Sequence, residues 1–211
     1  MNISMAPTLY HHPWSRAANV VWMLEEAGVD YALRWVDIQA GAQKTPEFLR
    51  LNPRGKLPGL VDGATVITES AAIALYLADR YAPGRLAPAL DDPARGSYLR
   101  WTLFAPSVIE PAAAAQTSGG SFNPGAVGWG SFEAMLGATE AALGGGPFLL
   151  GERFTMADVV LGGTLRYLLM FNMVEPRPAF AAYVGRLDQR PAYQRSVARN
   201  TAVSAEHGLT Q

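Results

Sequence analysis

Glu69 and Ser70 stand side by side just before Ile73–Tyr81, a segment whose apolar spacing predicts a helix. The first turn of a helix has unpaired backbone N–H groups and the positive end of the helix dipole. Ser70 would therefore face a carboxylate, and Glu69 would meet an ammonium group. Together they would hold the amino end of a small peptide. The plainer alternative is that Ser70 caps the helix and Glu69 is an ordinary first-turn acid.

A proline and a hairpin precede this helix. Leu57-Pro58 leads into a short apolar run, and Asp62-Gly63 separates that run from a second one, Ala64–Thr68. Asp-Gly between two apolar runs is typical of a hairpin, because both central residues of a type I′ turn need positive φ. A cis bond at Leu57-Pro58 would turn the Leu57 amide and carbonyl outward. We therefore expect a cis bond there and a Leu57 backbone that pairs with the ligand.

The run NPRGKLPGLVDG followed by ITESAAIALYLADRY resembles the glutathione-binding half of the cytosolic glutathione transferases. Upstream, LYHHPWSRAANVVWMLEEAGVDY is similar to the first strand and helix of that family. GERFTMADVVLGG is similar to the start of the family's core helical-domain helix. The match covers nearly the whole chain in the family's order. It implies an α/β thioredoxin-like N-terminal domain, an all-α C-terminal domain, glutathione as co-substrate and a homodimer.

The reaction of this family needs a thiolate, and a free thiol with a pKa near ~8.5 is mostly protonated at neutral pH. A hydroxyl near a helix N-terminus can donate to the sulfur. Counting back from Glu25-Glu26 puts the serine of the serine-type classes at Trp14 or Ser15, and the tyrosine of the tyrosine-type classes at Tyr10. We favour Ser15. Ser15 as a plain helix cap and Tyr10 as an ordinary strand residue remain the alternatives.

Cysteine is absent from the chain. Disulfides, thiolate metal sites and a cysteine nucleophile are therefore excluded, so the resemblance is to serine- or tyrosine-type, bacterial-like members of the family. Adjacent His11 and His12 would point to opposite sides of an extended chain, which makes them a poor metal pair. We expect no metal, although one of these histidines could line the site.

The resemblance carries glutathione contacts over to five positions: Lys56, Leu57, Pro58, Glu69 and Ser70. Lys56 would meet a carboxylate of the tripeptide. Leu57 would pair its backbone with the cysteinyl part, and Glu69 with Ser70 would hold the γ-glutamyl end.

A looser match involves Gln43 and Lys44, which would reach the glycine carboxylate. The electrophile pocket is expected between the two domains, as small-molecule clefts often are. Its candidate residues are aromatic or apolar: Trp14, Trp101, Phe104, Val108 and the glycine-rich loop at 119–130.

The 211 residues are 49% hydrophobic and 17% charged, which is typical of a folded protein with a sizeable core. A net charge of −1 provides no overall field for nucleic acid or an anionic membrane. No charged leader precedes an apolar run, and no stretch approaches the ~18 apolar residues of a membrane span. We expect a cytoplasmic protein with neither nucleic acid nor membrane as a partner.

Turn and cap signals predict the order strand–helix–strand–helix–strand–strand–helix in the first 80 or so residues. The proline-rich segment 82–93 is predicted to be a linker, and only helices are expected after it. The helix over 94–116 should bend near Pro106 and Pro111. Thr155 and Asp158 match a capping box with a structural role. The expected division is a glutathione-binding domain at 1–82, a linker at 83–93 and an all-α domain at 94–211 that contributes the electrophile pocket.

Two classes of function fit these features. The first is an enzyme that conjugates the glutathione thiolate to small hydrophobic electrophiles, as in detoxification. The second is a non-catalytic binding or regulatory protein of the same fold, and a glutathione-dependent isomerase is a further option within the enzyme class. Lys56, Glu69 and Ser70 favour the enzyme, because a protein that had abandoned glutathione need not keep them.

Overall fold

The computed structural model describes residues 6–209, and the chain divides by contacts into two compact units. The first unit combines residues up to 82 with those from 191 onward, and the second spans 83–190. The sequence assigned 94–211 to one helical domain. In the structure α9 (Pro191–Glu206) instead packs against α1 (Ala17–Ala27) of the first unit. The domain boundaries stay a prediction, because a division by contacts does not test whether each part folds by itself.

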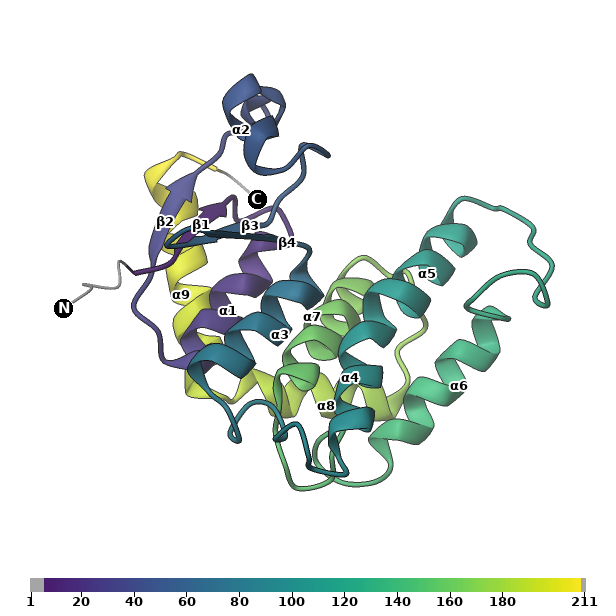
Figure 1. Ribbon diagram of the computed structural model, residues 1–211. Helices are drawn as coiled ribbons and strands as arrows, with labels where there is room; N and C mark the ends of the chain where they lie inside the picture. The colour runs from purple at the N-terminus through teal and green to yellow at the C-terminus, as the bar shows by residue number, and fades with distance from the viewer. Residues whose placement is uncertain (1–5, 210–211) are drawn as a thin grey trace. The chain divides into compact units, whose positions relative to one another are not determined.

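Four short strands form the sheet of the first unit, in the order β2-β1-β3-β4 (Figure 1). Strand β1 (Thr8–His11) pairs in parallel with β2 (Ala32–Trp35) and antiparallel with β3 (Gly59–Asp62). Strand β3 also pairs with β4 (Thr65–Thr68), which completes the predicted hairpin. This is the thioredoxin-like arrangement that the sequence predicts, and the all-helical second unit confirms the rest of the expected fold class.

Helices lie on both faces of this sheet (Figure 1). Helices α1, α3 (Ser70–Tyr81) and α9 lie on one face, and α2 (Pro46–Leu51) lies on the other, after the short 3₁₀ helix η1 (Ala42–Lys44). Side chains of β1 alternate between these faces. His11 is fully buried, whereas the Tyr10 ring contacts Phe48 of α2.

The second unit opens with one continuous helical run: α4 (Arg95–Phe104), the π-helical segment η2 (Ala105–Ile109) and α5 (Glu110–Thr117). Pro106 lies inside η2, and Pro111 lies in the first turn of α5. A proline donates no backbone hydrogen bond and crowds the preceding turn, so the wider π turn occurs where the sequence predicts a bend.

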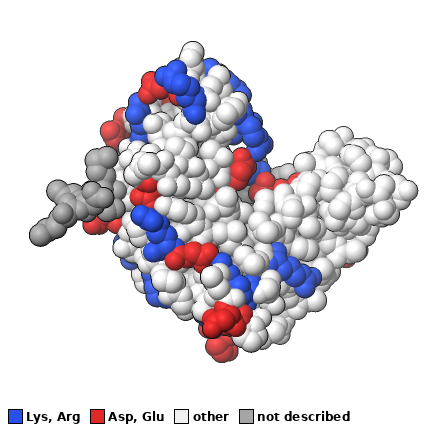
Figure 2. Space-filling model, in the orientation of Figure 1, with Lys and Arg blue, Asp and Glu red and all other residues white. Residues whose placement is uncertain are grey.

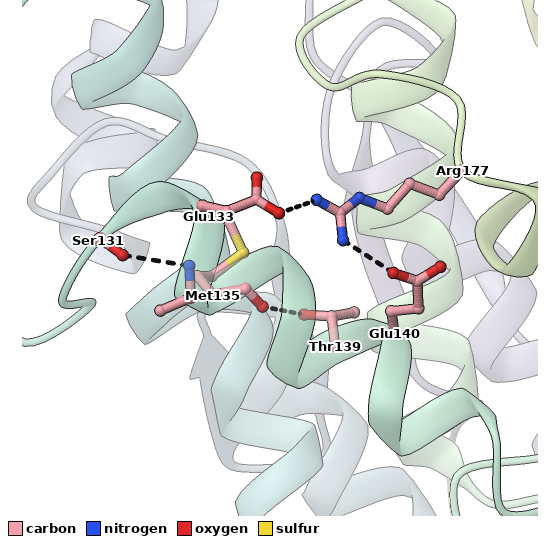
Figure 3. A network of polar contacts seen from close by, with 7 residues as sticks. Ser131, Glu133, Met135, Thr139, Glu140 and Arg177 are labelled. Atoms are coloured by element: carbon pink, nitrogen blue, oxygen red, sulfur yellow. Dashed lines mark hydrogen bonds and ion pairs between the residues drawn. The ribbon is translucent and has the colours of Figure 1, made fainter.

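Three further helices complete this unit: α6 (Phe132–Leu143), α7 (Met156–Met170) and α8 (Pro178–Asp188). Ser131 caps α6 by accepting from the Ala134 N–H at 3.1 Å. Arg177, just before α8, forms ion pairs with Glu133 and Glu140 of α6 (Figure 3). These two ion pairs join α6 to α8.

Charged side chains of both signs are mixed on the face shown in Figure 2. Residues 111–132 contain no charged side chain, and the surface around α5 is accordingly white in that view. Among residues 6–209, no helix has the length and apolar character needed to cross a bilayer.

The predicted capping box at the start of α7 is confirmed, and it belongs to a larger buried network. One oxygen of the buried Asp158 carboxylate accepts from the Thr155 N–H at 2.8 Å. The other accepts from the Leu149 N–H at 2.9 Å and from the Tyr183 hydroxyl at 2.8 Å. A single carboxylate therefore ties the start of α7 to the preceding loop and to α8.

We predict that Asp158→Ala lowers the free energy of unfolding by about 3–5 kcal/mol, because it leaves several buried donors without an acceptor. Tyr183→Phe removes one hydrogen bond of the same network and should cost only ~1 kcal/mol. Urea denaturation of both variants measures these losses. Equal losses for the two variants would contradict the central role of the Asp158 carboxylate.

Candidate functional site

Glu69 makes the connection between β4 and α3 by itself. Strand β4 ends at Thr68 and α3 begins at Ser70, so Glu69 adopts φ 66° and ψ 121°. Positive φ in a residue other than glycine costs of order 1–3 kcal/mol and is concentrated at functional sites. Glu69 is thus the N-cap of α3, although its carboxylate makes no hydrogen bond to the first N–H groups of the helix, and the use of Glu69 and Ser70 by a ligand stays a prediction.

The Ser70 hydroxyl at the start of α3 is buried and has no hydrogen-bond partner within residues 6–209. A buried polar group without a partner is costly, and it is usually satisfied by water or a ligand. Because the hydroxyl accepts from no N–H of its own helix, a simple capping role does not account for it. A role of Ser70 in binding a ligand stays a prediction.

The turn before Leu57 is organised by Asn52, a buried residue that the sequence analysis missed. Its side-chain Nδ2 donates to the Lys56 carbonyl at 2.8 Å, and its Oδ1 accepts from the Arg54 N–H at 3.1 Å. An asparagine that accepts from the N–H two residues later forms an Asx turn, and the sequence Asn-Pro-Arg-Gly is compatible with one. That signal could have identified Asn52.

The Leu57-Pro58 bond is cis, as predicted. The register between β1 and β3 ends at the pair Tyr10–Gly59, so the Leu57 backbone lies beyond the last paired residue of this edge. Lys56 is exposed beside it. Pairing of Leu57 with a ligand stays a prediction.

Arg54 links this turn to Glu69. Its Nη1 lies 2.8 Å from Glu69 Oε1, and the backbone carbonyl of Arg54 accepts from Lys44 Nζ at 3.0 Å. A Cβ at Gly55, where φ is 60°, would lie 2.8 Å from the Gln43 carbonyl, so η1 packs closely on the turn. The structure thus brings Lys44 and Glu69 together through Arg54, which no local sequence signal distinguishes from other exposed arginines.

Ser15 lies in the loop between β1 and α1. Its Oγ donates to the His12 carbonyl at 2.8 Å and accepts from the Ala17 N–H at 3.1 Å. Helix α1 begins at Ala17 with Arg16 as the N-cap, so Ser15, the cap that the sequence offers, lies one residue before the capping position. The hydroxyl nevertheless binds the first N–H of the helix, at the positive end of the dipole.

Tyr10 is placed differently. Its ring lies 5.8 Å from that of Phe48, and the Arg34 guanidinium lies 5.2 Å from its centre. Arg34 Nη1 is 3.4 Å from the Tyr10 hydroxyl and also pairs with Glu47 through its other nitrogen. Tyr10 thus belongs to a cluster on the α2 face of the sheet.

The two adjacent histidines have separate roles. His11 binds Asn200 of α9, with 2.7 Å between Nε2 and Oδ1, and burial lowers the pKa of His11 to about 4 despite this bond. His12 accepts from the Trp14 N–H at 3.0 Å through Nδ1. Burial also lowers the pKa of His12, and the nearby Asp37 carboxylate opposes this effect in part. Both rings are therefore neutral at pH 7.

Helix α9 is held along α1 by polar contacts that the sequence did not predict. Asn200 Nδ2 donates to the Ala18 carbonyl at 3.2 Å, and Arg195 Nε lies 2.7 Å from Glu25 Oε2. A hollow of about 520 Å³ lies at the Glu25 end of α1; its lining residues are Glu25, Gly28, Val29, Asp30, Tyr31, Arg195 and Arg199. Within this hollow Tyr31 also donates to Glu25 at 2.7 Å, so the Glu25 carboxylate joins α9 to the turn after α1.

Among the candidates for an electrophile pocket, Trp14 is 44% exposed and follows His12 in the Ser15 loop. Trp101 of α4 is buried, and its ring lies 4.9 Å from that of Phe104. Trp101 is therefore a core residue of the second unit. The electrophile pocket itself stays a prediction.

Comparison with known families supports the reading of these elements. Residues 5–79 match the model of the glutathione S-transferase N-terminal domain, and residues 79–186 match that of the glutathione S-transferase C-terminal domain. The chain belongs to the glutathione S-transferase family. Glutathione S-transferase 3 of Zea mays is 32% identical, over 92% of this chain and 95% of that protein. Human glutathione S-transferase theta-2 is 33% identical, over 76% of this chain and 71% of that protein.

Solved glutathione transferases have the same fold. URE2P6 from Phanerochaete chrysosporium, in complex with oxidized glutathione, superposes with a TM-score of 0.78 at 28% identity and covers 97% of this chain and 100% of its own. The theta class glutathione S-transferase from Xanthomonas axonopodis pv. citri, with glutathione bound, has a TM-score of 0.71 at 34% identity. It covers 91% of this chain and 97% of its own.

In this glutathione S-transferase chain, α3 is anchored to the hairpin by the buried Asp62 carboxylate. Tyr76 and Tyr81 of α3 donate to Asp62 Oδ2 at 2.7 and 2.6 Å, and Arg80 Nε lies 3.0 Å from the same oxygen. Burial by itself raises the pKa of Asp62, but the bonds from Tyr81 and Tyr76 and the Arg80 charge together lower it below its usual value. The ionised carboxylate therefore stabilises the position of α3, and with it that of Ser70.

We predict that the stabilisation by Asp62 depends on pH. A carboxyl whose pKa is lower in the folded state contributes fully at neutral pH, and the contribution is lost as the pH falls below about 4. Asp62→Asn should be less stable than wild type at pH 7, and the difference should narrow between about pH 4 and pH 2. Urea midpoints measured across this range test the prediction, and a constant difference down to pH 2 would contradict it.

Proposed function

We propose that this chain is a glutathione transferase that joins the glutathione thiolate to small hydrophobic electrophiles. The observation that carries the proposal is the start of α3, where the buried Ser70 hydroxyl has no protein partner within residues 6–209 and the preceding residue, Glu69, is the N-cap of the helix. Glutathione has a γ-glutamyl end with one ammonium and one carboxylate. Glu69 would bind the ammonium, while Ser70 and the free N–H groups of α3 would bind the carboxylate.

The remaining contacts follow from the same geometry. The Leu57 backbone, which lies beyond the β1–β3 register, would pair with the cysteinyl residue next to Pro58. Lys56 is exposed and would meet the glycine carboxylate, with Lys44 close to the same turn. Arg54 would hold Glu69 in place and add a positive charge. Glutathione is the co-substrate in this proposal, and no metal is involved.

Ser15 is the proposed donor to the thiolate. A hydroxyl has one hydrogen to donate, and the Ser15 hydrogen is directed to the His12 carbonyl at 2.8 Å. That carbonyl also accepts from the Ser15 N–H at 3.1 Å, so it keeps a partner when the hydroxyl turns toward sulfur. The Ala17 N–H continues to bind the Ser15 oxygen and polarises it. Ser15 can therefore change acceptors at small cost.

Tyr10 is the weaker candidate for this role. Its ring and hydroxyl contact Phe48 and Arg34 on the α2 side of the sheet. To reach a thiolate beside Ser15, the Tyr10 side chain would have to leave both contacts. This placement supports Ser15 as the donor and Tyr10 as a structural residue.

The electrophile would bind next to the sulfur, where the half-exposed Trp14 ring offers an apolar surface. The proposed setting is cytoplasmic detoxification by a homodimer. A dimer would add buried surface to a first unit whose own core is small.

We predict that Ser15→Ala raises the pKa of the bound glutathione thiol by one to two units, on the order of 1.4–2.7 kcal/mol. Turnover at neutral pH should fall by about ten- to a hundredfold, because ~1.4 kcal/mol is a factor of ten. Retention on immobilised glutathione should remain, because other groups hold the peptide. Thiolate absorbance of the binary complex against pH, with turnover of aryl halides, epoxides and isothiocyanates, measures both effects.

Tyr10→Phe is the matched control and should leave the thiol titration nearly unchanged. A shift with Tyr10→Phe and none with Ser15→Ala would reverse the assignment. Retention of glutathione without turnover of any electrophile in the wild type would favour the non-catalytic alternative. Failure to retain glutathione would contradict the whole proposal.

We predict a homodimer in solution. Light scattering at low micromolar concentration should give about twice the 22.6 kDa mass of the chain. A mass equal to that of one chain would contradict this prediction.

A further inference from the structure

Three aromatic rings are stacked beside the Ser15 loop. The His12 ring lies 4.6 Å from that of Trp35 at an angle of 30°, and the Trp35 ring lies 3.7 Å from that of His207 at an angle of 7°. These rings come from the end of β1, from β2 and from the residue after α9. All three belong to the first unit. The stack therefore connects the C-terminal end of α9 to the loop that carries Ser15.

The end of α9 is itself held in one conformation. The His207 N–H donates to the Val203 carbonyl at 3.1 Å, and Gly208 adopts φ 63°. The Leu209 N–H then donates back to Ser204 at 2.9 Å, which is the pattern of a helix end closed by a left-handed glycine. His207 thus presents its ring to Trp35 from a defined backbone.

At the end of the stack opposite His207, His12 fixes the conformation of the Ser15 loop. Its Nδ1 accepts from the Trp14 N–H at 3.0 Å, and its carbonyl accepts both from the Ser15 N–H and from the Ser15 hydroxyl. Burial lowers the pKa of His12, the Asp37 carboxylate opposes this in part, and His207 adds a smaller lowering, which is consistent with a neutral ring whose Nδ1 accepts from Trp14. A tilt of the His12 ring would therefore break the Trp14 bond.

The orientation of the His12 ring depends on its stacking. The other ring nitrogen, Nε2, is buried and has no hydrogen-bond partner within residues 6–209. Apart from the single bond at Nδ1, the ring is restrained by packing. It stacks on the Trp35 ring, and it meets the Trp14 ring edge-on with 5.8 Å between the ring centres. Trp35 is in turn covered by His207.

We propose that His207, at the end of the C-terminal helix, is a positioning residue that fixes the Ser15 loop through the stack of His207, Trp35 and His12. Its catalytic consequence rests on the proposed function, because Ser15 is the proposed donor to the thiolate. Helix α9 itself is attached by Asn200 and Arg195 farther back, so loss of the His207 ring leaves the helix in place. The effect is thus confined to the loop.

Amide hydrogen exchange in the full-length chain tests the inference without reference to turnover. The Trp14 N–H reports directly on its bond to His12. In His207→Ala its exchange rate should rise about three- to tenfold, the factor that corresponds to the loss of an aromatic contact. His207→Phe keeps a ring on Trp35 and should restore the rate to within about twofold of wild type. Glu206→Ala, at the exposed preceding residue, is the matched control and should leave the rate unchanged.

The kinetic arm separates positioning from binding. With an aryl halide, His207→Ala should lower kcat by a similar factor, about three- to tenfold, and leave the KM for glutathione within about twofold. An unchanged Trp14 exchange rate in His207→Ala, or equal effects of Glu206→Ala and His207→Ala, would overturn the inference. A wild type without turnover would contradict the proposed function, whereas the exchange rates would still decide whether His207 holds the loop.

Discussion

A single residue, Glu69, separates the end of strand β4 from the start of helix α3, and the candidate site depends on this short connection. Glu69 must turn the chain with positive φ although it has a side chain, at a cost of order 1–3 kcal/mol. Packing of the helix offsets this strain, because Ile73, Ala74 and Leu77 of α3 are fully buried. The Asp62 carboxylate holds Tyr76 and Tyr81 farther along the same helix. After this turn the Ser70 hydroxyl is buried with no partner among residues 6–209, and the Glu69 carboxylate pairs with Arg54.

The first unit is completed by the last helix of the chain. Helix α9 covers α1, binds His11 through Asn200 and ends in the stack on Trp35. The loop after β1 is thus supported from a segment nearly two hundred residues away, through hydrogen bonds and ring contacts rather than through the chain. A change in α9 can therefore act on the Ser15 loop without touching a ligand, because both are packed on the same strand ends.

Local signals account for what the sequence predicts well. Asp62-Gly63 and Thr155 with Asp158 each act within a few residues, and the hairpin and the capping box occur where those signals indicate. Features that depend on distant partners were missed. An amphipathic helix shows which of its faces is buried but not against what, so the sequence does not predict that α9 packs against α1. The Arg54–Glu69 ion pair and the stacking of His207 on Trp35 likewise join segments that no short-range pattern relates.

Charge around the candidate site is arranged locally, not globally. The chain carries a net charge of −1, yet Lys44, Arg54 and Lys56 gather on one turn and a single carboxylate, Glu69, pairs with one of them. Glutathione carries two carboxylates and one ammonium group, and ionisation of its thiol adds a further negative charge. Exposed ion pairs contribute at most about 1 kcal/mol each and are screened by salt, so this turn would guide the tripeptide more than bind it tightly.

In the proposed complex, most of the binding would come from groups that are already buried or fixed. These are the Ser70 hydroxyl, the first N–H groups of α3 and the backbone beside Pro58. In the proposed reaction the thiolate would depend on Ser15, whose oxygen accepts from the Ala17 N–H and whose hydroxyl hydrogen would leave the His12 carbonyl for the sulfur.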